Sequence, residues 1–399
     1  MSGRISTLGM HLLAVSQMQA RQVELSKTQQ QLATMRRVLV GRDDPIAAGV
    51  ATALERARAE HERYGTNADL AETRLQLEET ALVSLGDRLV RMREIAIQAN
   101  NATHTADSRR ALLAELREHR RALVALGNTS DGQGRFLFAG TADGSAPFVE
   151  TGGAVSYVGD QTRRQVEVAP EVTVVDSDPG SEIFMRVRTG DGQVAARAAA
   201  ANTGTAVLRS TGFVDASQWD GGHYRIEFAG GNYQVLDAAN TVVASGAYAS
   251  GQAIVVRGYQ VTLEGAPADG DRIDVGPAPA RSLFETVDAL IAAVQMADTP
   301  ASTQAAQQNA FYAAIQDLDT ASDHVVDLRS SVGARLATLE ASEEERNAQI
   351  VSLKSTLSEL RDLDYAEATS RLARESAALE AARLSYMRIQ SLSLFSMLR

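Results

Sequence analysis

The sequence contains no cysteine. Without thiols the chain can form neither disulfides nor Cys-ligated metal sites, and this absence is compatible with export through a secretion channel in an unfolded state. The chain also lacks an apolar run near the eighteen or so residues that a membrane span needs. Its segment 1–19 mixes His11, Ser16 and Gln17 into the apolar positions. We therefore expect no association with a membrane and no Sec-type signal peptide.

Positive charge is scarce as well. Lys and Arg number 39 against 50 Asp and Glu, which gives the 399-residue chain a formal net charge of -11. The basic residues are dispersed among acidic ones, a balance that argues against binding to nucleic acid. The length allows two or three domains.

Residues that could carry chemistry do not gather in known motifs. His61-Glu62 is followed by Gly65, where a zinc-protease helix would place its second histidine. Asp43-Asp44 precede a proline, so we interpret them as helix-capping residues rather than a catalytic pair. Asp269-Gly270-Asp271 lacks the remaining ligands of a calcium loop and predicts a plain turn. We expect no enzymatic activity, no cofactor and no metal site.

What the sequence does have is helical periodicity. From Val50 to Ala99, small or apolar residues keep one seven-residue register that only His61, Tyr64 and Glu78 interrupt. At 1.5 Å rise per residue, this stretch predicts a helix of about 75 Å. Its apolar seam is narrow, so another helix must cover it. The core residues predicted on this helix are Leu75, Leu82, Leu85, Leu89 and Met92.

The partner helix is encoded near the other end of the chain. Leu318, Val325 and Val332 repeat every seven residues, and Leu328 stands at the companion spacing. Pairing of the first and last thirds makes residues 141–280 an insertion. This insertion contains short β-branched and aromatic runs between glycine-rich turn signals, which predict antiparallel strands. The predicted strands are 166–175, 183–187, 224–228, 233–236, 253–256 and 259–263.

The two ends of the chain have thinner seams. A first helix is predicted over residues 8–40, and the heptad phase changes between Arg361 and Glu367, which indicates a separate terminal coiled segment. Helices that can bury so little apolar surface are only marginally stable in isolation. We expect residues 1–40 and 367–399 to be disordered in the isolated chain and to fold on assembly. The predicted assembly interface comprises Leu8, Leu12, Val15, Leu25, Leu32, Leu372, Leu379, Ala382, Tyr386 and Ile389.

These patterns predict a multi-domain α+β protein. Its terminal coiled-coil segment would combine residues 1–40 with 367–399. A long coiled-coil-like helical rod would combine residues 41–140 with 281–366, and residues 141–280 would form the inserted antiparallel β domain. Rods of this kind usually build assemblies, so the expected role is structural.

Three tracts resemble the flagellin superfamily. They are GRDDPIAA at 41–48, LVRMREIAIQAN at 89–100 and NTSDGQGRFLFAG at 128–140. The tract 379–398 is more similar to the hook-associated protein 3 family of hook–filament junction proteins than to filament flagellin. The chain departs from the superfamily at Met35, where glycine is more common. The resemblance covers roughly residues 1–140 and 281–399, with the tracts in the same order.

The resemblance implies a structural protein of the extracellular bacterial flagellum, exported by the flagellar type III apparatus without a cleaved signal. It implies terminal segments that pair into an axial coiled layer. The implied partners are other copies of the chain in a ring-like layer, hook-associated protein 1 on the hook side, flagellin on the filament side and a flagellar export chaperone.

Two other functions are compatible with the same pattern. The chain could be filament flagellin itself, which would grow a long homopolymer. Alternatively, the β insertion could bind carbohydrate while the rod only carries it, since the insertion is acidic and contains Trp219, the one tryptophan of the chain.

Overall fold

The computed structural model describes residues 7–101, 106–296 and 299–397. The chain divides into two compact units. Unit 1 comprises Met1–Thr66 and Ser342–Arg399, and unit 2 comprises Asn67–Ala341. The long helices α2 (Pro45–Ala99) and α5 (Ala301–Arg361) contribute residues to both units. The α+β fold predicted from the sequence is confirmed, with paired N- and C-terminal helices and an inserted antiparallel β region.

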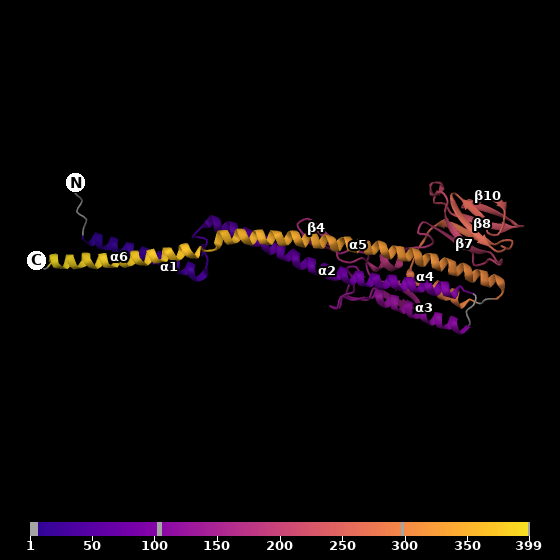
Figure 1. Ribbon diagram of the computed structural model, residues 1–399, viewed down its shortest axis with the longest axis horizontal. Helices are drawn as coiled ribbons and strands as arrows, with labels where there is room; N and C mark the ends of the chain where they lie inside the picture. Colours follow the sequence, from indigo (N-terminus) through magenta and orange to yellow (C-terminus); the bar gives the residue numbers. More distant parts are fainter. Residues whose placement is uncertain (1–6, 102–105, 297–298, 398–399) are drawn as a thin grey trace. The chain divides into compact units, whose positions relative to one another are not determined.

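In unit 1, the two terminal helices α1 (Thr7–Thr34) and α6 (Tyr365–Met397) run side by side (Figure 1). Helix α6 begins at a local cap, since the Asp364 Oδ1 atom accepts a hydrogen bond from the Glu367 backbone N–H at 3.0 Å. The break in heptad phase near Arg361 therefore coincides with a real break between α5 and α6.

The first helix ends at Thr34, six residues earlier than the sequence predicted. Met35 has a φ of 55°, in the left-handed region that favours glycine. The chain then becomes extended, because Arg36 forms a β-bridge with Asp362 and Leu363 N–H donates to the Met35 carbonyl at 3.1 Å. This backbone pairing with a distant segment replaces the last predicted helical turns, and seven-residue periodicity carries no information about it.

The two acids before α2 have different partners. Asp44 caps the helix as predicted, since its Oδ1 atom accepts from the Ala47 N–H at 3.0 Å. Asp43 instead stabilises the turn that precedes α2. Its Oδ2 atom accepts from the Val40 N–H at 3.1 Å, and its Oδ1 atom pairs with the Lys27 ammonium at 3.0 Å. The Lys27 ammonium lowers the pKa of the Asp43 carboxyl.

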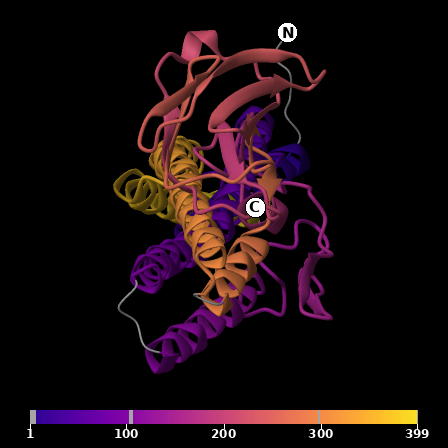
Figure 2. The ribbon, with the colours of Figure 1, turned by 90° about the vertical axis from the view of Figure 1, so that its right-hand side faces the viewer.

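In unit 2, helices α2 and α5 run antiparallel. Arg93 pairs with Asp319 while Glu79, about four turns nearer the N-terminus of α2, pairs with Arg329. Helices α3 (Ala106–Gly127) and α4 (Leu283–Gln295) pack against each other and complete the helical layer (Figures 1 and 2). Their apolar faces enclose the larger of the two buried cores.

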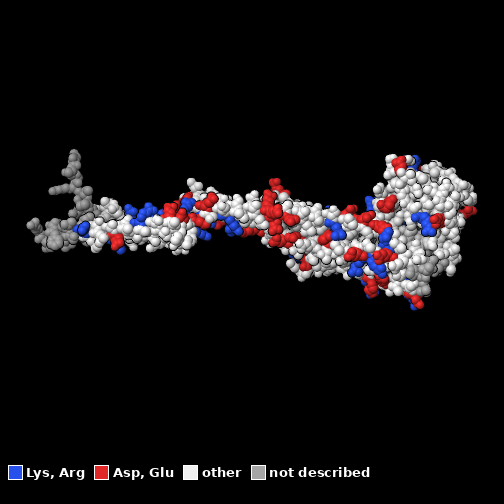
Figure 3. Space-filling view, in the orientation of Figure 1, with Lys and Arg blue, Asp and Glu red and all other residues white. Residues whose placement is uncertain are grey.

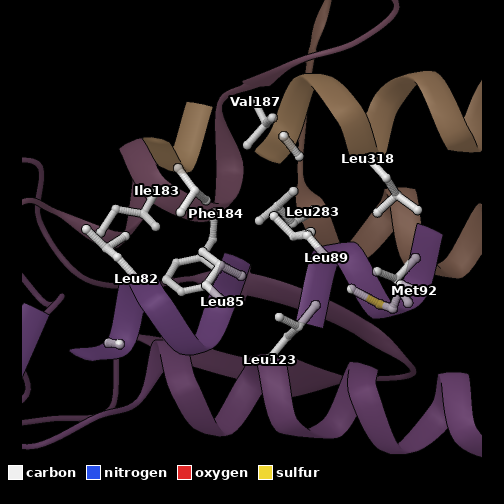
Figure 4. Close-up of a cluster of buried hydrophobic side chains, with 14 of the residues drawn as sticks. Leu82, Leu85, Leu89, Met92, Leu123, Ile183, Phe184, Val187, Leu283 and Leu318 are labelled. Carbon is white, nitrogen blue, oxygen red and sulfur yellow. The ribbon is translucent and has the colours of Figure 1, made fainter. Parts of the chain in front are cut away.

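The segment that follows α3 also contributes to this larger core. It contains the hairpins β1 (Phe148–Thr151) with β2 (Ala154–Tyr157) and β3 (Gln165–Ala169) with β4 (Val172–Val175), a π-helical turn (Ser181–Met185) and β5 (Val187–Arg188). Two predicted strands are therefore wrong in form. Residues 166–175 are a hairpin that turns at 170–171, and residues 183–187 are mostly the π-helical turn. That turn directs Ile183 and Phe184 into the helical core (Figure 4).

The remaining strands form a two-sheet β sandwich with a core of its own. They are β6 (Val194–Ala198), β7 (Val207–Phe213), β8 (Tyr224–Ala229), β9 (Asn232–Asp237), β10 (Val242–Ala247), β11 (Ala253–Val256), β12 (Tyr259–Glu264) and β13 (Arg272–Pro277). One antiparallel sheet has the order β10-β9-β8-β13-β6 and the other has the order β11-β12-β7. The short strand β14 (Ala280–Arg281) returns to pair with β5. Figure 2 shows the sandwich on one side of the unit 2 helices.

Candidate assembly surfaces

The α1–α6 pair has almost no core. Among the described residues of these two helices, only four are buried, namely Thr28, Gln31, Ala368 and Leu379. Two of the four are polar, and one of the apolar pair is an alanine. Burying so little apolar surface cannot offset the entropy of ordering two long helices. The α1–α6 pair therefore has far less apolar stabilisation of its own than the helices of unit 2.

The predicted assembly-interface residues mostly lie where α1 meets α6. Leu379 is buried, while Val15, Leu25, Leu32, Leu372, Ala382 and Tyr386 are half-buried. Leu12 is exposed. The side chains of Leu8 and Ile389 lie outside the described residues. The seven-residue seam is thus largely used within the chain, between its own two ends.

One polar contact also joins the two helices within this seam. The Tyr386 hydroxyl lies 2.5 Å from the His11 Nε2 atom. Their rings meet edge to face with centroids 5.3 Å apart. A tyrosine at a heptad position therefore serves here as a hydrogen-bonding partner as well as an apolar one.

Apart from Leu12, four large apolar residues of these helices are uncovered that the predicted interface did not include. Leu13, Val23, Leu384 and Met387 are each more than half exposed. The signal was present in the sequence, because these are large apolar residues in otherwise polar helices at positions that the heptad register does not explain. We call these four residues the outer patch.

In unit 2 the predicted rod-core residues lie on the buried faces of the long helices α2 and α5. Leu75, Leu82, Leu85, Leu89 and Met92 on α2 are buried, as are Leu318, Val325 and Val332 on α5. Leu328 is partly buried against the same core. Figure 4 shows Leu82 of α2 close to Ile183 of the π-helical turn, and Leu318 of α5 close to Met92 of α2.

Three buried carboxylates link this core to the segments around it. The Glu78 carboxylate on α2 accepts the Asp178 backbone N–H at 3.1 Å, and the Asp178 carboxylate pairs with Arg335 on α5 at 2.9 Å. Burial, and then the negative charge of Asp178, raise the pKa of the Glu78 carboxyl to about 8. The third carboxylate, Asp317 on α5, accepts from Arg281 at 2.7 Å and also pairs with Arg197 on β6.

The residues weighed for other chemistry have structural partners. Asp271 accepts backbone N–H groups of Thr203, Gly204 and Ala268, so this segment is a turn as predicted. Trp219 is half-buried, and its ring packs against those of Phe213, Tyr224 and Tyr259. This packing leaves little of the indole free to serve as a sugar-stacking platform.

Within the described ranges, no cluster of three or more His, Asp or Glu side chains is arranged to hold a metal ion. In the same ranges, no helix combines the length and the apolar character that crossing a bilayer would require.

Comparison with family models gives three matches. Residues 5–143 match the bacterial flagellin N-terminal helical region and residues 315–398 match the bacterial flagellin C-terminal helical region. Residues 197–277, which comprise most of the β sandwich, match the D2-like domain of flagellar hook-associated protein 1.

Individual relatives give a finer comparison. The crystal structure of FlgL from Xanthomonas campestris is 42% identical, covers 76% of this chain and 99% of its own chain, and superposes with a TM-score of 0.72. The flagellar junction protein FlgL from Legionella pneumophila is 27% identical, covers 78% of this chain and 100% of its own, and has a TM-score of 0.70. Flagellar hook-associated protein 3 of Salmonella typhimurium is 33% identical over 181 residues, which are 45% of this chain and 56% of the relative. The match thus spans little more than half the length of that relative.

Paired N- and C-terminal helices with an inserted β sandwich define a structural protein of the flagellin type. Neither the fold nor the matched families indicate enzymatic activity. Within this class, the chain belongs to the flagellar hook-associated protein 3 (FlgL) family. It is accordingly a structural component of the extracellular flagellum.

Proposed function

We propose that copies of this chain form the layer that joins the flagellar hook to the filament, by packing their α1–α6 pairs against one another. Hook-associated protein 1 would lie on the hook side of this layer and flagellin on the filament side. The Legionella relative, described as a flagellar junction protein, supports this role.

The observation that carries the proposal is the outer patch. Leu13, Val23, Leu384 and Met387 are exposed on a helix pair with almost no core of its own. Burying one such side chain contributes roughly 1.5–3 kcal/mol. Four of them in each copy would contribute on the order of 6–12 kcal/mol as an upper estimate. A free-energy gain of that size can offset the conformational entropy lost when both ends become ordered on assembly.

Assembly and folding of the ends would then be one event. Residues 1–40 and 367–399 would be disordered in the isolated subunit and form the axial layer in the polymer. Residues 41–140 with 281–366 would form the surrounding rod, and residues 141–280 the outer β domain. A subunit with unfolded ends also suits export through a narrow channel, with a flagellar export chaperone covering the apolar seams until release.

The first experiment compares cells with and without this protein. Without it, hooks should end bare and flagellin should be shed into the medium, as seen by electron microscopy and by immunoblotting of the supernatant. Re-expression of the full chain should restore filaments. Normal filaments in the deletion strain would contradict the junction role and favour a minor or redundant flagellin.

A second experiment tests the outer patch itself. The variant Val23→Glu with Leu384→Glu places charges on the patch without touching the seam, and we expect it to be exported yet fail to support filaments. The matched control, Gln22→Glu with Ser385→Glu, alters neighbouring exposed polar residues of the same two helices and should retain motility. Full motility of the patch variant would contradict packing through these residues.

A further inference from the structure

A cleft lies on the five-stranded sheet of the β sandwich, on the face turned away from the sandwich core. Its volume is about 590 Å³, which falls within the range of roughly 300–1,000 Å³ that is usual for ligand pockets. Its walls come from β6, β8 and β13, from the end of β9, and from Pro277 and Pro279. We call this hollow the sheet cleft, and its charged side chains include Arg197, His223, Arg225, Arg272 and Asp274.

Small residues leave the floor of the sheet cleft low. Gly276 on β13 stands opposite Ala195 on β6 in the register of the sheet, and neither projects beyond a methyl group. His223 lies over this floor, since a Cβ built on Gly276 would come within 2.5 Å of the His223 Nδ1 atom. His223 is exposed and makes no hydrogen bond or ion pair with the other residues that the structure describes. Its ring nitrogens are therefore available to a ligand.

Basic side chains are scarce in the sandwich, and most of them line the sheet cleft. Residues 190–279 contain five arginines, one histidine and no lysine. Three of these arginines and the histidine line the cleft. In the view of Figure 3, few charged side chains lie over the sandwich. The strong hydrogen-bond donors of this domain are thus concentrated in one hollow.

Acceptors alternate with these donors across the sheet. Asp274 on β13 stands directly opposite Arg197 on β6 and Arg225 on β8. Because neighbouring strands lie about 4.8 Å apart, the three side chains form a donor–acceptor–donor row. Glu227, on the same face, pairs with Arg225 at 3.2 Å. The cleft therefore offers carboxylates and guanidinium groups side by side rather than a surface of one charge.

The charged groups of the sheet cleft keep capacity for a ligand. Arg197 is held in place by its ion pair with the buried Asp317 of α5. Arg272 and Asp274 are about half exposed and 3.7 Å apart, and exposed pairs of this kind contribute little to stability. A guanidinium group has five N–H donors. Each arginine can therefore bind a ligand oxygen while it keeps its acidic neighbour.

This mixture of donors and acceptors suits a sugar better than an ion. A simple anion would lie close to the carboxylates of Asp274 and Glu227, which repel it. For a cation, the described ranges contain no arrangement of three or more His, Asp or Glu ligands. Each sugar hydroxyl both donates and accepts, so neighbouring hydroxyls can bind Asp274 and an adjacent arginine together. Pro277 and Pro279 supply apolar surface for the C–H face of the ring.

We propose that the sheet cleft binds a neutral carbohydrate, such as the hexose units of an extracellular polysaccharide. Asp274 accepts hydrogen bonds from sugar hydroxyls, while Arg225 and His223 donate to neighbouring sugar oxygens. This site is separate from Trp219, whose ring packs against the sandwich core. The inference adds a binding activity to the structural role and does not depend on the junction function.

Oligosaccharide binding by the full-length protein tests the proposal. The protein is applied to an array of neutral hexose oligosaccharides and hexuronate oligosaccharides, and the strongest neutral probe is then titrated by calorimetry. We expect binding to neutral probes, with an affinity that changes little between low and high salt because no net charge is neutralised. Absence of binding to every neutral probe, binding to hexuronates alone, or a steep loss of affinity with salt would overturn the proposal.

Substitutions locate the binding within the sandwich. Asp274→Asn and Arg225→Gln should each weaken binding of the neutral probe by about tenfold, since each removes a charged hydrogen-bonding group. The matched controls are Arg209→Gln and Glu264→Gln, which alter an exposed arginine–glutamate pair on the other sheet and should bind as the native protein does. Unchanged Trp219 fluorescence verifies that each variant keeps a folded sandwich. Equal affinities in the cleft variants and the controls would refute the assignment to the sheet cleft.

Discussion

At the scale of single residues, two buried carboxylates place constraints on the stability of unit 2. Glu78 has no exposed surface, and Asp178 lies beside it. The pKa of the Glu78 carboxyl, about 8, lies above its ordinary value of 4.5. The folded protein therefore holds this proton at a pH where the unfolded chain has lost it. This group's contribution to stability is complete below about pH 4.5 and is lost as the pH rises to 8.

We expect the unfolding free energy of the native protein to fall between pH 5 and 8 by an amount on the order of a few kcal/mol. Glu78→Gln, which is neutral at every pH, should remove most of this slope in urea unfolding. The neighbouring Glu79→Gln is the control, since Glu79 makes a partly exposed ion pair with Arg329 and should leave the slope unchanged. Parallel pH profiles for the native chain and Glu78→Gln would refute the assignment.

Asp317 gives a second prediction at this scale. It is 2% exposed and neutralises Arg197 and Arg281, so Asp317→Ala leaves two partly buried guanidinium groups uncompensated. We expect a loss of about 3–5 kcal/mol. Asp319→Ala removes the half-exposed pair with Arg93 and should cost less than about 1 kcal/mol. Urea unfolding followed by circular dichroism and by Trp219 fluorescence measures both, and equal losses would contradict the argument.

At the scale of elements, helices of similar sequence character have very different cores. In unit 2, α2 and α5 enclose Leu75, Leu89, Leu318 and Val332. The α1–α6 pair encloses little beyond Leu379. Helix stability in proteins comes mainly from such packing rather than from intrinsic propensity. The two pairs should therefore differ in local stability.

Hydrogen exchange on the isolated, full-length subunit measures this difference. We expect the backbone amides of residues 9–34 and 366–388 to exchange at least about a hundredfold faster than those of residues 75–99 and 310–340. In assembled flagella the terminal segments should become protected. Slow exchange throughout both terminal segments of the monomer would contradict the coupling of folding to assembly.

The sequence predicted the helices better than the strands. Seven-residue spacing identified the buried residues of α2 and α5 because that spacing is a local property of the chain. The strands β6, β7, β10 and β13 had no predicted counterpart, because their positions depend on partners far away in sequence. Likewise Ile183 and Phe184 form a π-helical turn because the helical core accepts both side chains, which local β propensity does not report.

At the scale of the whole chain, the β sandwich is an insertion with closely spaced ends. The Thr189 N–H donates to the Pro279 carbonyl at 3.1 Å, and β5 pairs with β14. The sandwich also has its own core, distinct from the helical one. Only a few side chains of α5 connect to it, among them Asn309, which accepts the Leu208 N–H at 2.7 Å.

We expect replacement of residues 190–278 by a short Gly-Ser linker to leave the helices of unit 2 folded. The melting temperature should fall, since Asn309 and Asp317 lose partners, but unfolding should stay cooperative. Thermal unfolding followed at 222 nm by circular dichroism measures this. Loss of the cooperative transition would show that the sandwich is required for the helical core.

The sequence by itself determined the helical character of both ends, the capping role of Asp44 and the resemblance to flagellins, because these depend on local spacing and on short motifs. Tertiary structure decided where α1 ends and how the strands are ordered. It also decided which apolar residues remain free. Val15 and Leu25 are half-buried, whereas Leu13 and Val23 remain exposed. Periodicity identifies a face of a helix, but burial of that face depends on segments hundreds of residues away.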